Sequence, residues 1–198
     1  MKHIRNRAIL ILLILALTWF VLMFAAPAME EKGTITHLDG AANRVDNADR
    51  YEDFNPVSRV VYLFGDFNCH QIESRSYHVN GNQMPLCARD VGTFGGVVMG
   101  LVLALPVRVS NSSRETLARI TFRGRSLPRF LNPTGFFILV LFLGFLPTAL
   151  DGGIQLITNY ESTNPMRLLT GGIMGAVGAF LLGIFMQSKF GPEPGLDG

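Results

Sequence analysis

Both cysteines of the 198-residue chain fall in one polar stretch, and each has a further candidate metal ligand close by. His70 follows Cys69 directly, and Asp90 stands three positions after Cys87. Zinc and other transition metals accept thiolate sulfur, imidazole nitrogen and carboxylate oxygen, zinc in a tetrahedral shell. The spacing therefore predicts a metal site whose ligands are Cys69, His70, Cys87 and Asp90.

The same two cysteines have two other interpretations, which the sequence leaves open. If Cys69 and Cys87 face an oxidising compartment, they form a disulfide, and closing that loop would contribute about 3 kcal/mol of stability. Alternatively, both remain free thiols. The sequence does not fix the identity of a bound metal, although zinc suits the ligand types.

A second set of polar side chains stands at or near the ends of apolar segments. Asp151 can pair with Arg89 or Arg167 in a salt bridge that locks helix ends together, or the arginines can hold an anionic headgroup. Asp151, Glu161 and His70 are acid–base candidates, but nothing orders their roles, so an enzymatic activity stays open. The predicted pocket consists of Gln71, Arg75, Arg89, Asp151, Gln155, Glu161, Asn164 and Arg167.

These motifs resemble those of a family of small bacterial and archaeal membrane proteins that is grouped as a domain of unknown function. The family signature is found here as Cys-His-Gln at 69–71, Arg-Ser at 75–76, Pro-Leu-Cys-Ala-Arg at 85–89 and Asp-Gly-Gly-Ile-Gln at 151–155. The resemblance covers residues 57–187 and implies a membrane protein, but no activity. Many members carry Cys where this chain has Asp90, so the resemblance also implies a metal-type Cys-x-x-Cys pair that this chain has altered.

Four uncharged apolar segments must position these residues. Hydrophobic residues make up 48% of the chain and charged residues only 16%, against about 25% charged in a soluble domain. At about 1.5 Å per residue, each segment approaches the hydrocarbon thickness of about 30 Å. The sequence therefore predicts an all-α membrane protein with four transmembrane helices, at 8–26, 91–107, 133–150 and 168–186.

The two ends of these segments carry further signals. Asn132 is a suitable N-cap for the third helix, and Pro133 suits its first position. The first segment follows basic residues and precedes a small-x-small site at 26–28, as in a signal peptide, but its length favours a retained helix. The polar composition of 29–58 favours a loop, and the more apolar stretch 57–67 favours a helix at the membrane interface.

The distribution of Lys and Arg predicts the orientation of the chain. The segment 108–129 has six arginines and one glutamate, and such basic segments stay on the cytoplasmic side. Both termini are therefore expected in the cytoplasm of a prokaryotic cell, and the polar motifs outside its cytoplasmic membrane. The predicted divisions are an N-terminal helix (1–28), an extracytoplasmic segment (29–90), a three-helix membrane domain (91–190) and a tail (191–198).

Glycines at four-residue spacing predict close contacts between helices, since small residues let helix backbones approach in lipid. They are Gly92, Gly96 and Gly100 in the second segment, and Gly171 and Gly175 in the fourth. These faces either pack within the chain or dock a partner subunit. The sequence thus supports a site for a metal or a lipid headgroup, or alternatively an accessory subunit of a membrane complex. The net charge of +2 and the absence of nucleic-acid motifs exclude nucleic acid as a predicted partner.

Overall fold

The computed structural model describes residues 7–109, 112–123, 128 and 131–190. The long helices are α1 (Arg7–Met29), α3 (Ala88–Ala104), α5 (Pro133–Ile157) and α6 (Asn164–Phe190); the shorter elements are η1 (Ala48–Tyr51), α2 (Pro56–Asn68), η2 (Glu73–Arg75), β1 (Ser76–Val79), β2 (Asn82–Cys87) and α4 (Ser113–Thr121). The expected tail 191–198, the basic residues before Arg7, and Arg125 and Arg129 of the basic segment lie outside the described residues.

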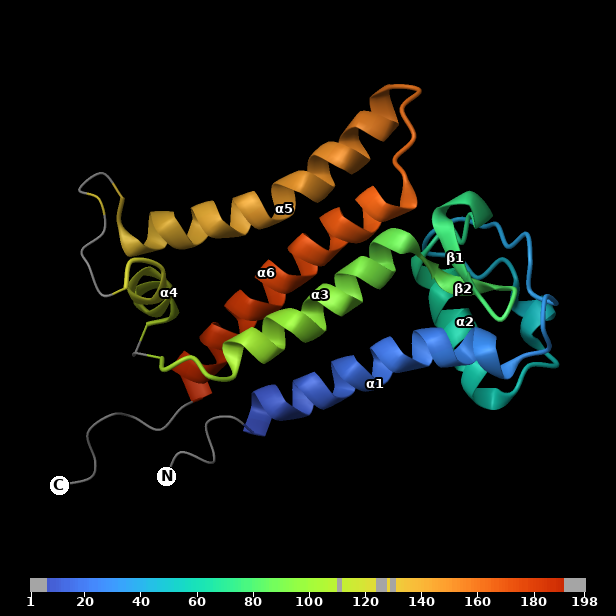
Figure 1. Ribbon diagram of the computed structural model, residues 1–198, viewed down its shortest axis with the longest axis horizontal. Helices are drawn as coiled ribbons and strands as arrows, with labels where there is room; N and C mark the ends of the chain where they lie inside the picture. The colour runs from blue at the N-terminus through green and yellow to red at the C-terminus, as the bar shows by residue number, and fades with distance from the viewer. Residues whose placement is uncertain (1–6, 110–111, 124–127, 129–130, 191–198) are drawn as a thin grey trace.

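The four long helices lie side by side with alternating direction, and the small elements cap the two ends of this bundle (Figure 1). Helix α4 lies at the end where α1 begins and α6 finishes. The hairpin β1–β2 and helix α2 lie at the opposite end, where α3 begins and the α5–α6 connection passes. The motif-bearing residues of the sequence therefore gather at one end of the bundle.

The prediction of a helical membrane protein is supported by three candidate spans. Helices α1, α5 and the part Asn164–Ser188 of α6 are each long and apolar enough to cross a membrane. Their large side chains face outward, as Leu15 at 60% and Phe142 at 58% exposure illustrate, and such surfaces suit lipid. Helix α3 lies alongside these helices but has only 17 residues. It is not one of the three candidate spans, so a fourth crossing by α3 is an additional step.

Helices α3 and α6 touch backbone to backbone through their glycines. A Cβ atom on Gly96 would lie 2.2 Å from the carbonyl oxygen of Gly172, and one on Gly175 would lie 2.1 Å from that of Thr93. Gly92, Gly100 and Gly171 are equally close to the facing helix. The glycine faces thus meet each other within the chain, and they are not free as docking surfaces for a partner subunit.

Helix α5 starts as the sequence predicts but ends later. The Asn132 side chain accepts a hydrogen bond from the backbone N–H of Gly135 at 2.7 Å, and Pro133 follows the cap. The expected end at residue 150 is wrong, because the helix continues through Gly152 and Gly153 to Ile157. Each glycine costs about 1 kcal/mol relative to alanine, and side-chain bonds made from this turn to other helices offset that cost.

The segment between α1 and α3 forms a small folded unit whose core it shares with the end of α1. Ile35, Leu38, Tyr51, Val61 and Tyr62 are buried together. The stretch expected as loop is indeed irregular apart from η1, and the expected helix at 57–67 is present as α2. Side-chain amides hold the irregular stretch: Asn82 Oδ1 accepts from Ile35 N at 3.0 Å and Gln83 Oε1 from Leu38 N at 2.9 Å.

The hairpin β1–β2 corrects the all-α prediction. Asn80 and Gly81 form its turn with φ of 55° and 73°, and His78 pairs with Gln83 across the strands. Two consecutive positive φ angles are the mark of a type I′ turn, and Asn-Gly is its preferred sequence. The hairpin brings the end of β2 against the end of α2, and this contact sets the position of the cysteines.

Candidate functional site

A cavity of about 380 Å³ lies where the hairpin unit meets the ends of three long helices. It is lined by Cys69, His70, Ile72, Arg75, Cys87, Arg89, Gly152, Gln155, Leu156 and Arg167. These residues come from five places along the chain: the end of α2, the segment before β1, the start of α3, the last turns of α5 and the first turn of α6. We call this cavity the arginine pocket.

The two cysteines reach the pocket because α2 and β2 touch closely. Cys69 is the C-cap of α2, and Cys87 ends β2 and precedes α3. A Cβ atom on Gly65 would lie 2.0 Å from the carbonyl oxygen of Pro85, so nothing larger than glycine fits between the two elements. This contact fixes the separation of the two cysteines.

Both cysteines are free thiols in the structure, so the disulfide alternative is not formed there. One ligand atom each of Cys69, Cys87 and Asp90 lies within 4.8 Å of the others, and the Cys87 thiol donates to Asp90 Oδ2 at 3.1 Å. A hydrogen bond to Cys87, together with burial, raises the pKa of the Cys69 thiol. The same bond lowers the pKa of Cys87.

His70 stands apart from this group. Among the described residues, the cluster that can hold a metal ion contains the two cysteines and Asp90 but not His70. Cys69 has an extended backbone, with φ of −132° and ψ of 150°, and neighbouring side chains on extended backbone point to opposite sides. His70 is therefore exposed at the pocket wall, and the predicted four-ligand set reduces to three.

Arg89 forms the shortest ion pair among the described residues of the pocket. Its Nη2 atom lies 2.5 Å from Asp151 Oδ2, and the two side chains are 25% and 7% exposed. Gln155, one turn further along α5, donates to the backbone and side-chain oxygens of Asp151 at 2.8 and 3.4 Å. Within the described residues, the buried Nε of Arg89 has no hydrogen-bond partner.

Arg167 is more deeply buried than Arg89, at 3% exposure. Its guanidinium donates to Gln155 Oε1 at 2.9 Å and to Asn164 Oδ1 at 3.5 Å. Its nearest carboxylate oxygen in the described part of the chain belongs to Glu161, at 3.9 Å. The same oxygen accepts from Arg75 Nε at 3.3 Å, so one exposed carboxylate serves two arginines.

Three guanidinium groups therefore surround one cavity, and two carboxylates face them. A buried charge is stable only when it is paired and hydrogen-bonded, yet Arg167 relies on amides and Arg89 keeps one free N–H. Arginine binds carboxylate and phosphate oxygens with two parallel hydrogen bonds. The arrangement can accept an additional anion.

One member of the predicted pocket lies elsewhere. Gln71 is fully buried inside the hairpin unit, where it accepts from Tyr51 OH at 2.8 Å and donates to Pro85 O at 3.0 Å. Its backbone oxygen accepts from Gln83 at 2.6 Å. Gln71 thus ties the unit together, and Asn164 links the start of α6 to it by donating to Ser76 O at 3.4 Å.

The apolar and glycine lining of the pocket was not predicted from the sequence. Ile72, Gly152 and Leu156 line it, and Gly152, Gln155 and Leu156 share one helical face because they are three and four positions apart. This three- and four-residue spacing indicates a shared face only if α5 continues beyond residue 150. Leu156 and the adjacent Ile157 are 87% and 84% exposed.

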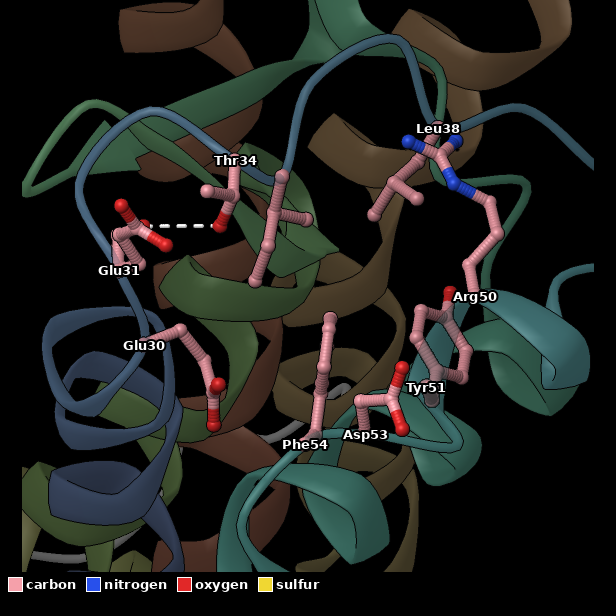
Figure 2. A pocket seen from close by; sticks show the side chains of 9 residues that line it. Glu30, Glu31, Thr34, Leu38, Arg50, Tyr51, Asp53 and Phe54 are labelled. Atoms are coloured by element: carbon pink, nitrogen blue, oxygen red, sulfur yellow. Dashed lines mark hydrogen bonds between the residues drawn. The ribbon is translucent and has the colours of Figure 1, made fainter.

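A second cavity, of about 340 Å³, lies in the irregular stretch beyond α1. Figure 2 shows its lining, which is Glu30, Glu31, Thr34, Ile35, Leu38, Arg50, Tyr51, Asp53 and Phe54. Arg50 does not pair with these acids, since it donates to the backbone oxygens of Thr36 and His37 at 2.7 and 3.2 Å. We call this cavity the acidic pocket.

The comparisons with known proteins bear on one of the two pockets. A family described as "Predicted membrane protein (DUF2085)" matches residues 69–181, a range that contains the whole lining of the arginine pocket and none of the acidic pocket. An uncharacterised protein of Methanocaldococcus jannaschii is 29% identical over 132 residues, which cover 66% of this chain and 72% of that protein. No solved structure matches the chain.

Proposed function

Since the chain belongs to the DUF2085 family of predicted membrane proteins, we propose that its arginine pocket binds the phosphate headgroup of an anionic amphiphile at the membrane surface. The observation that carries this proposal is the meeting of Arg75, Arg89 and Arg167 around one cavity. They come from η2, α3 and α6, so the folded chain alone brings them together.

The proposal needs a fourth crossing of the membrane by α3. Helix α3 runs beside α6 over the length from Gly92 to Gly100, and its start and end coincide with the two ends of the bundle (Figure 1). Two polar side chains in its first turn, Arg89 and Asp90, would lie at the interface. Four crossings leave the start of α1 and the end of α6 on one side.

The charge distribution supports an outward-facing pocket. Arg108, Arg114 and Arg119 lie at the opposite end of the bundle with α4, and short basic segments remain on the cytoplasmic side. The arginine pocket then opens at the extracytoplasmic face of a prokaryotic cytoplasmic membrane. Lipids of that leaflet would be its nearest source of phosphate.

The rim of the pocket suits a ligand that has a hydrocarbon tail. Ile72 and Leu156 bring apolar surface to the cavity, and Leu156 and Ile157 continue that surface outward along α5 with more than four-fifths of each exposed. A free phosphate gains nothing from this surface. An amphiphile can place its headgroup among the arginines and its tail along α5.

Calorimetry on the full chain in detergent tests the proposal. Short-chain phosphatidylglycerol is titrated against short-chain phosphatidylcholine and inorganic phosphate. We expect phosphatidylglycerol to bind at least tenfold more tightly than phosphatidylcholine, because the zwitterionic headgroup carries a compensating cation. Inorganic phosphate is expected to bind more weakly than phosphatidylglycerol, because it leaves the apolar rim uncovered.

Arg75→Gln is the informative variant, because Arg75 is half-exposed and its loss leaves the buried ion pair in place. Removing one charge-assisted hydrogen bond of about 1.5–3 kcal/mol lowers the affinity by roughly tenfold or more. Arg59→Gln is the matched control, since Arg59 is exposed on α2 outside the pocket. Equal affinities of the two variants, or equal binding of the two lipids, would overturn the proposal.

A further inference from the structure

The headgroup proposal rests on the arginines and assigns nothing to the cluster of Cys69, Cys87 and Asp90. Its three donor atoms come from the end of α2 and from the junction of β2 and α3, and they lie within 4.8 Å of one another. Both cysteines line the arginine pocket. We propose that Cys69, Cys87 and Asp90 bind one divalent transition metal ion of the zinc type, with a free coordination position that opens into the pocket.

The distances suit a tetrahedral ion. Zinc binds sulfur at about 2.3 Å and carboxylate oxygen at about 2.0–2.2 Å, so two of its ligand atoms are roughly 3.5–3.8 Å apart. The Cys87 Sγ and Asp90 Oδ2 atoms are 3.1 Å apart, and the largest separation in the group is within 4.8 Å. Side-chain rotations alone can bring three such ligands to an ion.

The cluster has a carboxylate of its own to offer a cation. The carboxylates of Asp151 and Glu161 pair with arginines, whereas Asp90 makes no ion pair in the described part of the chain. Its contact is the hydrogen bond from Cys87. A metal would replace the two thiol protons, and thiolates are the form in which cysteine binds metals.

The scaffold holds the ligands in place without the metal. The close contact between Gly65 and Pro85 fixes α2 against β2, and the backbone N–H of Cys69 donates to Gly65 O at 2.8 Å. Arg89, which stands between Cys87 and Asp90 in the sequence, is tied to Asp151. Metal sites with three protein ligands leave the fourth position to water or a substrate, and here that position faces the arginines.

Cobalt and zinc binding to the reduced full-length chain in detergent test this site. We expect one equivalent of Zn²⁺ and, with Co²⁺, the near-ultraviolet thiolate charge-transfer band of a tetrahedral site. Cys87→Ser and Cys69→Ser should each lower the affinity by at least tenfold and weaken that band. His78→Ala, the matched control, should change neither, since His78 pairs with Glu73 and does not line the arginine pocket.

Asp90→Cys is a second test, in which we expect a gain in metal affinity. A misfolded variant cannot produce such a gain. A third thiolate should tighten zinc binding and add intensity to the charge-transfer band. The proposal is overturned if the reduced chain binds less than about a tenth of an equivalent of either ion, or if Asp90→Cys binds metal no better than the parent chain. A Cys69–Cys87 disulfide in chain purified without reductant would also overturn it. Phosphatidylglycerol binding to the metal-free chain tests the headgroup proposal separately.

Discussion

The arginine pocket and the acidic pocket differ in how their charges are held. In the arginine pocket, Arg89 and Arg167 stand on rigid helices, lose most of their solvent and have named partners at 2.5–2.9 Å. In the acidic pocket, Glu31 and Asp53 are exposed on irregular backbone. A charge removed from water must be compensated by neighbours, whereas a solvated one need not be. In the arginine pocket the charges are therefore compensated by neighbouring groups, whereas in the acidic pocket they are left to solvent.

The largest effect should come from separating the helices that carry the arginines. Gly96→Leu places a side chain where the Gly172 carbonyl oxygen lies 2.2 Å from the added Cβ. Because backbone cannot give way as a side chain can, we expect destabilisation at or above the usual overpacking range of about 1–3 kcal/mol. Thermal unfolding in detergent measures it.

Gly153→Ala is the control for this change, since no described atom lies within 4 Å of its added Cβ. It should be neutral or stabilise α5 by about 0.5–1 kcal/mol, the helix preference for alanine. If Gly96→Leu melts with the parent chain, the arginine pocket does not depend on the contact between α3 and α6.

Asp151→Asn should lower stability and raise anion affinity together. It leaves the mostly buried Arg89 guanidinium without its carboxylate, and breaking such a pair costs about 2–4 kcal/mol after discounting for its partial exposure. The freed guanidinium then has more to gain from phosphate, so phosphatidylglycerol should bind several-fold more tightly. Thermal unfolding measures the change in stability, and calorimetry measures the change in affinity. If Asp151→Asn lowered both or raised both, the contrast between the pockets would be contradicted.

The cysteines of the arginine pocket should differ in reactivity. The lowered pKa of Cys87 means more thiolate at neutral pH, whereas the raised pKa of Cys69 keeps that thiol protonated. In the reduced, metal-free chain, iodoacetamide should therefore modify Cys87 several-fold faster, as peptide mass mapping can measure. Cys69→Ala removes the hydrogen bond that lowers the pKa of Cys87, so the Cys87 rate at neutral pH should fall. An unchanged rate would mean that the thiols are not coupled.

The smallest effect belongs to the acidic pocket. Asp53→Asn changes an exposed carboxylate that has no ion pair in the described structure, so the free energy of unfolding should stay within about 0.5 kcal/mol of the parent. Phosphatidylglycerol binding should also be unchanged. A loss comparable to that of Asp151→Asn would show that the two pockets are built alike.

The sequence predicts the parts of this fold that depend on local pattern. The glycine spacing anticipates the face between α3 and α6, and Asn132 and Pro133 mark the start of α5. The sequence leaves Asp151 to pair with Arg89 or Arg167, and the structure shows the pair with Arg89. Asn80-Gly81 is also a typical hairpin turn sequence, although the all-α prediction did not include a hairpin.

The remaining features depend on contacts between distant residues. Gly152 and Gly153 favour an end to α5, whereas in the folded chain Asp151 and Gln155 of this turn bind Arg89 and Arg167 of the other helices. His70 looks like a metal ligand because it adjoins Cys69, but the extended backbone turns it away. Gln71 looks like a pocket residue, yet Tyr51 and Gln83 draw it into the core of the hairpin unit.

The glycine contact between α3 and α6 has a consequence for how a ligand enters. Arg89 and Arg167 stand on two helices that no side chain separates at Gly92 or Gly171, so the backbones that carry these two arginines are in direct contact. The opposite wall, at the end of α5, has Leu156 and Ile157 largely uncovered, and it is joined to these helices by Asp151, which pairs with Arg89, and by Gln155, which accepts from Arg167. A displacement of α5 that widened the arginine pocket would therefore have to break both the Arg89–Asp151 ion pair and the Arg167–Gln155 hydrogen bond.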